Sequence, residues 1–458
     1  MTRPSDPSGS STSLLSVLRS PWRLVTDRVP WPWSPQEPPT RTPDELDRAI
    51  QQAQLAILLA AFGHGRGARL HEGERDDDVY LYRPGRLLVR SEDLDRVLAF
   101  FAERTDRYGG RARSRQVVDG LHHVLLPRRA EVPAVLPDLE AELGDDVARP
   151  DHVLYVTPGQ GGGRMCPADE PRPPRRTRPL PEVAERASAG KGVRVSVVDT
   201  GWWEPAETTG LSPWLHDVDG DAEVIDQHAI HPYAGHGTFV AGVVRCLAPA
   251  VGVEVEGFLT HGGAAYESAI VRELDEAVVE TFDPHVISIS AGTYTRHDRG
   301  LLAFDVFAST RRLLDGEGDL LVVAAAGNDS TTRPFWPAAY DWAVGVGALD
   351  PDGQVCDFSN TGSWVDVYAL GRDLVNAYPA GTYTCQEPPH VGTVRHFKGL
   401  AQWSGTSFAT PVVSGAIAAH MSATGRTAHE SVTDLLAAGR PLADPHGNPI
   451  TAVGPPFA

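Results

Sequence analysis

The sequence predicts an α/β fold, a doubly wound and mainly parallel sheet preceded by a small α+β domain. In the second half of the chain, short apolar runs alternate with helical patterns, as buried parallel strands and their crossover helices do. Ahead of them, a β-α-β-α-β alternation ends in a stretch rich in Gly, Pro and Arg. We expect that stretch, residues 158–190, to be a linker that packs against nothing.

The chain begins with residues 1–40, where Pro, Ser and Trp occur without periodicity and predict a flexible tail. A helix is expected next. Thr42 suits its cap, Pro43 its first position and Glu45 the third residue after the cap, and an apolar stripe then runs to Gly63.

This helix and the small domain together span residues 41–157. Ser91 is expected to cap a second helix, whose apolar residues lie on one face. The other elements expected in the domain are strands at 79–82, 86–90, 116–126 and 152–157 and a helix at 133–143.

Residues 191–447 form the predicted main domain, and residues 448–458 a C-terminal tail. Each apolar run in this region is short and bounded by turn residues, which is typical of a strand buried on both faces. The buried strands expected in this way are 193–198, 253–258, 286–289, 320–325 and 342–346.

Charge and composition exclude several function classes. The 458 residues include 41 basic and 60 acidic ones, and the net charge of -19 disfavours nucleic acid and anionic membrane surfaces as partners. The most apolar helical stretch, residues 53–62, is too short to cross a bilayer, and the N-terminus lacks a secretory signal pattern. We therefore expect a cytoplasmic location, where the four cysteines, which have no C-x-x-C spacing, stay reduced.

Three segments of the main domain each place a reactive side chain where a strand ends or a helix begins. Asp199 follows the strand 193–198, at the sheet edge where open α/β folds place their sites. His236 stands between two glycines at the start of an apolar helix, which leaves the imidazole accessible. Ser407 lies at a helix N-terminus, whose N–H groups favour developing negative charge. Taken singly, Asp199 fits a turn cap better than a catalytic role, whereas the setting of His236 fits a catalytic role at least as well as a structural one.

These segments carry the motifs D-T-G, H-G-T-x-V-A-G and G-T-S-x-A-T-P in that order, and over residues 191–438 the chain resembles the subtilisin-like (subtilase) family. The resemblance implies a serine endopeptidase in which His236 takes the proton of Ser407, Asp199 orients the imidazolium and an acyl-enzyme forms. It also implies that Asn328, in the segment A-A-A-G-N-D, completes the oxyanion hole together with the Ser407 N–H.

Substrates of this family lie as an added strand beside the enzyme, so affinity comes from main-chain bonds and specificity from pockets. The resemblance implies that residues 290–292 are the docking strand, that residues 325–327 wall the pocket and that Phe335 shortens it. A small or medium apolar residue is therefore expected immediately before the cut. The pocket residues predicted in this way are Ser290, Ala291, Gly292, Ala325, Ala326, Gly327 and Phe335.

The implied mechanism requires no cofactor, and calcium is the one candidate ion. Residues 217–221 alternate carboxylates as calcium loops do, but the distal Glu of the full motif is missing. No set of metal ligands is therefore assigned. Residues 378–398, just before the Ser407 motif, form an insertion without a counterpart that we can map, and its role stays open.

A polypeptide is the expected substrate, and several alternatives stay open. A dedicated processing peptidase would cut one partner or precursor peptide, whereas a catalytically silent relative would use the same fold to bind peptides. The β-α-β-α-β region resembles the small ferredoxin-like propeptides of the family, which implies a self-inhibited precursor, a zymogen. A domain for partner recognition is the alternative for that region.

Overall fold

The computed structural model describes residues 43–63, 66–156, 170–208, 210–259, 262–275, 282–315 and 319–455. All of these residues lie in one unit, Thr42–Ala458. The predicted tail 1–40, the predicted cap Thr42, Thr157 at the end of the predicted small domain and residues 158–169 of the predicted linker lie outside the described residues.

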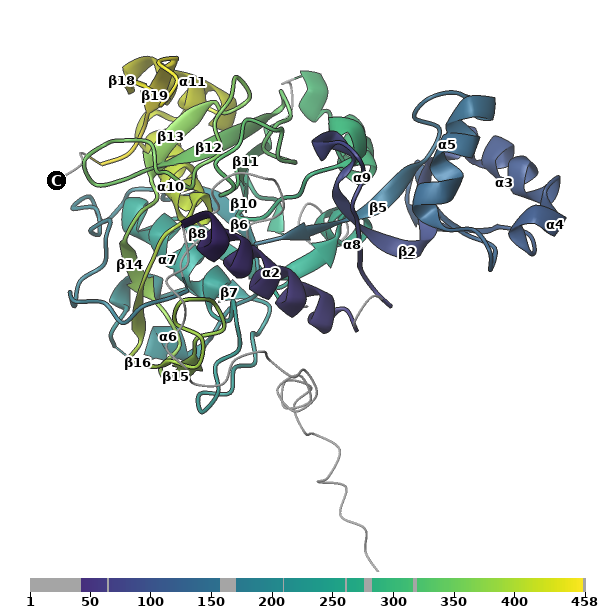
Figure 1. The fold of residues 1–458 in the computed structure, drawn as a ribbon. Coiled ribbons are helices and arrows are strands. Elements are labelled where there is room, and N and C mark those ends of the chain that lie inside the picture. Colours follow the sequence, from purple (N-terminus) through teal and green to yellow (C-terminus); the bar gives the residue numbers. More distant parts are fainter. Residues whose placement is uncertain are drawn as a thin grey trace, which may run out of the picture. The chain divides into compact units, whose positions relative to one another are not determined.

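A nine-stranded sheet forms the centre of the main domain, and its strands are parallel except for the β18–β19 pair at one edge (Figure 1). The predicted parallel strands are thereby confirmed, with ends that differ by a few residues. In spatial order the sheet contains β18 (Arg440–Ala443), β19 (Pro449–Ala452), β13 (Val367–Leu370), β12 (Ala343–Leu349), β11 (Leu321–Ala325), β10 (Val286–Ile289), β6 (Arg194–Val198), β8 (Gly252–Glu256) and β7 (Val218–Gly220).

Helices cover both faces of this sheet, as a doubly wound fold requires. One hydrophobic core joins the sheet to α7 (His236–Leu247), α10 (Thr406–Thr424) and α11 (Ala428–Ala438). A second core joins the opposite face to α8 (Glu267–Glu273) and α9 (Leu302–Thr310).

The register of the three central strands decides where the site lies. Val198, Ile289 and Ala324 are paired across β6, β10 and β11, so the residues that follow them emerge side by side at one edge. Asp199 and Ser290 follow directly at this edge, where the carboxyl ends of parallel strands place functional groups in such folds.

The region before the linker folds as a second sheet, with the order β3-β4-β2-β5-β9 and β1 paired with β2. Its strand β9 comes from the main domain, so the two regions share one ladder of main-chain hydrogen bonds. A core of its own lies between this sheet and the helices α3 and α5. The elements are β1 (Arg69–His71), β2 (Tyr80–Arg90), α3 (Leu94–Ala102), α4 (Thr105–Tyr108), β3 (Arg113–Val118), β4 (Leu121–Leu125), α5 (Val132–Leu143), β5 (Arg149–Tyr155) and β9 (Ala264–Tyr266).

Three details of the prediction for this region are wrong. The predicted strand 116–126 is a hairpin, because Gly120 takes a positive φ of 80° that turns the chain between β3 and β4. The two strands predicted at 79–82 and 86–90 are one strand, β2, with a register shift where Gly85 lies. Ser91 does not cap α3; it opens a 3-10 turn, and its Oγ lies 3.1 Å from His122 Nε2.

The expectation that the linker packs against nothing is wrong for its described part, residues 170–190. Arg172 and Gln402 exchange both main-chain hydrogen bonds, at 2.9 and 2.7 Å, and the Leu180 N–H donates to Val375 O at 2.8 Å. These partners belong to the antiparallel pair of β14 (Leu374–Ala377) and β17 (Leu400–Trp403). Composition predicts that a segment lacks an apolar face, but its N–H and C=O groups still need partners, and a nearby sheet edge supplies them.

The insertion forms the hairpin of β15 (Gly381–Thr384) and β16 (Val394–Phe397) and contacts two distant segments. The Glu170 carboxylate accepts hydrogen bonds from Tyr383 Oη at 2.7 Å and from the Gln386 N–H at 2.5 Å. The predicted N-terminal helix is α2 (Pro43–Ala61). Its Gln54 Nε2 donates to Glu387 Oε1 of the insertion at 2.7 Å. The insertion thus contacts both the linker and α2.

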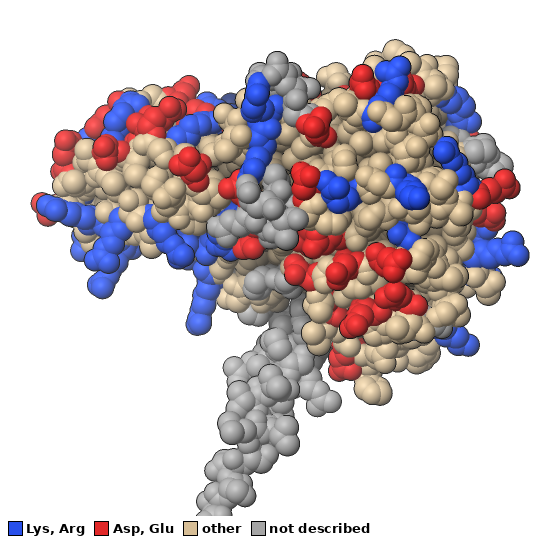
Figure 2. Space-filling model, turned by 180° about the vertical axis from the view of Figure 1, so that it is seen from behind, with Lys and Arg blue, Asp and Glu red and all other residues tan. Residues whose placement is uncertain are grey.

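Figure 2 shows that charged side chains are unevenly distributed over the face it presents. Lys and Arg side chains line one edge of the small domain, whereas Asp and Glu gather over part of the main domain. On this face, many of the acidic side chains are therefore concentrated on part of the main domain. Among the helices that the structure describes, none combines the length and the apolar character that crossing a membrane requires.

Candidate active site

Asp199 and His236 form the centre of the site. Asp199 is fully buried at the end of β6, and its two carboxylate oxygens lie 2.7 and 2.9 Å from His236 Nδ1. The Thr200 N–H donates to Asp199 Oδ1 at 2.8 Å, which holds the carboxylate in place. With Nδ1–H donating to the carboxylate, Nε2 is the nitrogen left to accept a proton, as a general base must.

The His236 ring lies among aromatic side chains at the start of α7. The ring centroids of Trp403 and Phe408 are 5.3 and 5.1 Å away. His236 Nε2 is buried and makes no hydrogen bond with any residue in the part of the chain that the structure describes. Because Asp199 bonds one side of the His236 ring and aromatic side chains pack against it, the ring has little freedom to rotate away from Asp199.

Ser407 is the second residue of α10, so its backbone N–H is one of those that an α-helix leaves without an internal partner. Its Oγ donates to Ser290 O at 3.2 Å. The structure therefore brings Ser407 to the site but does not form the Ser407–His236 hydrogen bond that the triad prediction implies. Such catalytic hydrogen bonds are often long or absent before substrate binds. Without substrate, the Ser407 hydroxyl instead donates to the nearby Ser290 carbonyl.

Asn328 lies beside Ser407 and its amide is oriented by one residue. Asn328 Oδ1 accepts hydrogen bonds from the Thr406 N–H at 2.8 Å and from Thr406 Oγ1 at 3.0 Å. The Gly327 N–H in turn donates to Thr406 Oγ1 at 3.1 Å. Because the amide oxygen is occupied, the Nδ2 group is the end of Asn328 that can donate to an oxyanion.

A small cavity of about 10 Å³ lies against the Ser407 side chain. Phe335 packs closely against the predicted docking strand, since a Cβ placed on Gly292 would lie 2.3 Å from Phe335 Cε1. Ala326, predicted as a wall residue, does not line the cavity and packs into a separate core with Leu349. The cavity is lined by Tyr155, Val156, Ser290, Ala291, Ala325, Gly327, Asn328, Phe335, Thr406 and Ser407.

Two of these lining residues, Tyr155 and Val156, were not predicted as site residues. The main chains of Tyr155 and Gly292 exchange hydrogen bonds of 3.0 and 3.1 Å, and the Val156 N–H donates to Gly263 O at 2.9 Å. The end of β5 thus lies as an added strand between β9 and the predicted docking strand 290–292. The sequence contained one indication that this strand lies near the site, because β5 leads directly into the linker.

The candidate calcium segment provides few ligands. Asp219 Oδ1 accepts the N–H of the adjacent Gly220 at 2.8 Å, and Asp221 Oδ2 accepts the Gly257 N–H at 3.0 Å. Within the described ranges, no three His, Cys, Asp or Glu side chains are grouped so that they could hold a metal ion. Calcium therefore stays a prediction without a ligand set.

Comparison with known proteins places this arrangement in a family. Residues 190–440, more than half of the chain, match the subtilase family. The chain belongs to the subtilase family. Membership gives it the α/β fold of subtilisin and the serine-protease class.

Individual subtilases are similar to the same part of the chain. An intracellular serine protease of Paenibacillus polymyxa is 28% identical over 50% of this chain and 66% of its own, so the match spans about two thirds of that relative. Subtilisin Savinase of Lederbergia lenta is 30% identical over 52% of this chain and 79% of its own. The solved structure of the prenylagaramide maturation protease PagA covers 57% of this chain and 88% of its own at 26% identity, with a TM-score of 0.43, which supports no conclusion on substrate.

The Phe335 side chain gives a testable prediction on specificity. We expect Phe335→Ala to raise kcat/KM for peptides with Leu before the cut by roughly 10- to 100-fold relative to those with Ala, because burying a Leu side chain is worth about 1.5–3 kcal/mol. A peptide library with a varied residue before the cut measures this ratio. The control is Phe358→Ala, which removes an equally buried ring outside the cavity and is expected to leave the ratio unchanged. An unchanged ratio in Phe335→Ala contradicts the assignment, as does a wild-type preference for Arg or Lys.

Proposed function

We propose that this subtilase is a serine endopeptidase whose catalytic residues are Asp199, His236 and Ser407, with Asn328 in the oxyanion hole. The observation that carries the proposal is the buried Asp199–His236 pair, 2.7 Å apart, whose imidazole packs against Phe408, the residue that follows Ser407 in α10. The substrate is a polypeptide, whose main chain pairs with residues 290–292.

Each residue has one role in the proposed reaction. His236 Nε2 takes the Ser407 hydroxyl proton while Oγ attacks the scissile carbonyl, and the Asp199 carboxylate stabilises the imidazolium that forms. The tetrahedral oxyanion accepts hydrogen bonds from Asn328 Nδ2 and from the Ser407 N–H. His236 then protonates the leaving amine, and water hydrolyses the acyl-enzyme by the same steps in reverse.

Covalent labelling tests the identity of the nucleophile. A fluorophosphonate is expected to modify Ser407 and no other serine, because only a hydroxyl with a base and an oxyanion hole beside it reacts at a useful rate. Peptide mapping by mass spectrometry locates the label. A label at Ser404 or Ser414 instead would refute the assignment.

We infer that the region before the linker is an inhibitory domain of a precursor. Tyr155 and Val156 occupy the cleft in the place of a substrate strand, and their side chains line the cavity at Ser407. Helix α2 adds a cover, since its Leu58 and the Phe62 that follows the helix pack in one core with Tyr155 and Phe335. A substrate strand cannot enter until β5 leaves.

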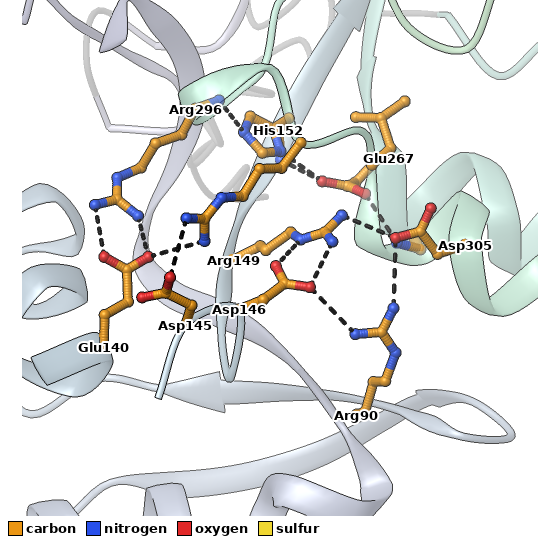
Figure 3. Close-up of polar contacts among 12 residues, drawn as sticks. Arg90, Glu140, Asp145, Asp146, Arg149, His152, Glu267, Arg296 and Asp305 are labelled. Atoms are coloured by element: carbon orange, nitrogen blue, oxygen red, sulfur yellow. Dashed lines mark hydrogen bonds and ion pairs between the residues drawn. The ribbon is translucent and has the colours of Figure 1, made fainter. Parts of the chain in front are cut away.

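Ion pairs support a stable association of this domain with the main domain (Figure 3). Arg296 of the main domain makes two hydrogen bonds with Glu140, at 2.5 and 2.9 Å. Arg149 Nη1 donates to Asp305 at 2.8 Å. The buried His152 and Glu267 side chains meet at 2.8 Å, and Glu267 also accepts the His152 N–H. Because these pairs are partly or fully buried, salt screens them less than it would screen surface pairs.

Comparison of the wild type with Ser407→Ala tests the precursor. We expect intact-mass analysis to find a cut between residues 158 and 191 in the wild type alone, because Ser407 must cleave its own chain next to the bound strand. The released fragment, added back, is expected to inhibit the mature enzyme. A wild-type chain that is fully active and uncut over 458 residues contradicts the proposal and favours a partner-recognition domain.

A dedicated processing peptidase is the second candidate. It is favoured by Phe335, which packs against Gly292 and Gly327 of the predicted pocket and leaves little room for a side chain before the cut. A narrow specificity suits an enzyme that cuts one precursor. A peptide library that is cleaved after many residue types would exclude this candidate and leave the general endopeptidase.

A further inference from the structure

Glu223 connects the two loops that carry Asp199 and His236. It lies after β7, and its Oε2 accepts hydrogen bonds from the Gly235 N–H at 2.9 Å and from Thr200 Oγ1 at 3.4 Å. Gly235 directly precedes His236, and Thr200 directly follows Asp199. One carboxyl group therefore contacts the neighbour of each member of the pair.

Thr200 extends this connection into α7. Its Oγ1 accepts the Gly237 N–H at 3.1 Å while its hydroxyl proton is directed to Glu223, and its own N–H donates to Asp199 Oδ1 at 2.8 Å. The chain of hydrogen bonds thus runs from Gly237 through Thr200 to Glu223 and on to Gly235. It fixes the peptides on both sides of His236 relative to Asp199.

The surroundings hold Glu223 and Gly235 against each other. The Glu223 N–H donates to Trp202 O at 2.8 Å, which attaches its backbone to the loop after β6. On the other side, a Cβ on Gly235 would lie 2.3 Å from Pro379 Cδ, and Gly235 has a φ of 75°. The Gly235 peptide is therefore confined between Pro379 and the Glu223 carboxyl group.

We propose that Glu223 is a positioning residue that sets the geometry of the Asp199–His236 pair for catalysis. The inference deepens the proposed function, since it rests on that pair acting in proteolysis. It goes beyond the triad and the oxyanion hole because Glu223 touches neither substrate nor reacting atoms. Nothing in its local sequence, A-E-V-I-D, distinguishes it from the other acidic residues of the loop.

The surroundings of Glu223 disfavour its ionised form. Burial raises the pKa of Glu223 well above its ordinary value, and the negative charge of Asp199 raises it further. Tyr378 is a further titratable group nearby, and burial and the charge of Glu223 raise its pKa. In both hydrogen bonds Glu223 is the acceptor, so a glutamine amide oxygen can take the place of its carboxyl oxygen.

Two variants with one control test the proposal in the full-length chain. Glu223→Ala removes the acceptor, whereas Glu223→Gln keeps it. We expect Glu223→Ala to lower the rate of fluorophosphonate labelling of Ser407 by about 10- to 100-fold and Glu223→Gln to stay within about threefold of the wild type. The control is Asp226→Ala in the same loop. The Asp226 carboxylate accepts the local N–H of His228 at 2.9 Å, and this variant is expected to label at the wild-type rate.

A second readout does not depend on proteolysis. The proton between His236 Nδ1 and Asp199 gives a low-field NMR resonance, which we expect to be retained in Glu223→Gln and to exchange with water at least tenfold faster in Glu223→Ala. If the wild type is not labelled, the proposed function fails, and this resonance still decides the role of Glu223. Should Glu223→Ala not fold, Thr200→Val, which breaks the same chain of bonds, replaces it. The proposal is overturned if folded Glu223→Ala shows the labelling rate and the exchange rate of the wild type. It is also overturned if Glu223→Gln does not preserve these two rates.

Discussion

Replacing Ser407 by alanine is expected to lower kcat for peptide hydrolysis by about 10⁶-fold, because both the acyl-enzyme and its precursor form on Oγ. The side chain lies at the N-terminus of α10, and among the residues that the structure describes its one hydrogen-bond partner is Ser290 O, so its loss leaves few unsatisfied groups. The thermal unfolding midpoint is therefore expected to change little. Hydrolysis of a fluorogenic peptide and calorimetry measure the two quantities.

The matched control for this prediction is Ser404→Ala, three residues earlier in the same segment. The Ser404 hydroxyl accepts the Asp373 N–H at 3.0 Å and does not line the cavity at Ser407. Activity within about threefold of the wild type is expected. Hydrolysis that persists undiminished in Ser407→Ala would exclude Ser407 as the nucleophile, whatever the fold of the variant.

Asn328→Ala is expected to lower kcat by about 10²- to 10³-fold with little change in KM, because the Nδ2 donor acts on the oxyanion and not on the ground-state carbonyl. This loss corresponds to about 2.7–4 kcal/mol of transition-state stabilisation. Steady-state kinetics on one peptide separate kcat from KM. A selective rise in KM would instead assign Asn328 to substrate binding.

A second substitution separates the donor of Asn328 from its structural bonds. Asn328→Asp keeps an acceptor for the Thr406 N–H, which lies 2.8 Å from Oδ1, but has no N–H to donate. We expect a loss of kcat at least as large as in Asn328→Ala, since the carboxylate also repels the oxyanion. If Asn328→Asp retains wild-type kcat, orientation of Thr406 is the only role of the side chain.

The sequence by itself determined the family, the parallel strands and the segments that carry chemistry. Apolar runs such as 286–289 predict buried strands because hydrophobic patterning is local, and the carboxyl ends of such strands meet at one edge. The segments around Asp199, His236 and Ser407 were recognised for the same reason, because each motif is contiguous. Their catalytic roles stay a proposal for kinetics to test.

Only the tertiary structure decided which distant groups meet. The contact of Glu223 with Gly235, the strand of Tyr155 in the cleft and the Ser407 hydroxyl turned to Ser290 O each join residues from separate elements. The linker illustrates the same limit, because its composition did not show that Arg172 pairs with a sheet edge. Periodicity and motifs record what a segment prefers locally, whereas these contacts depend on how the packed elements bring side chains and free N–H groups together.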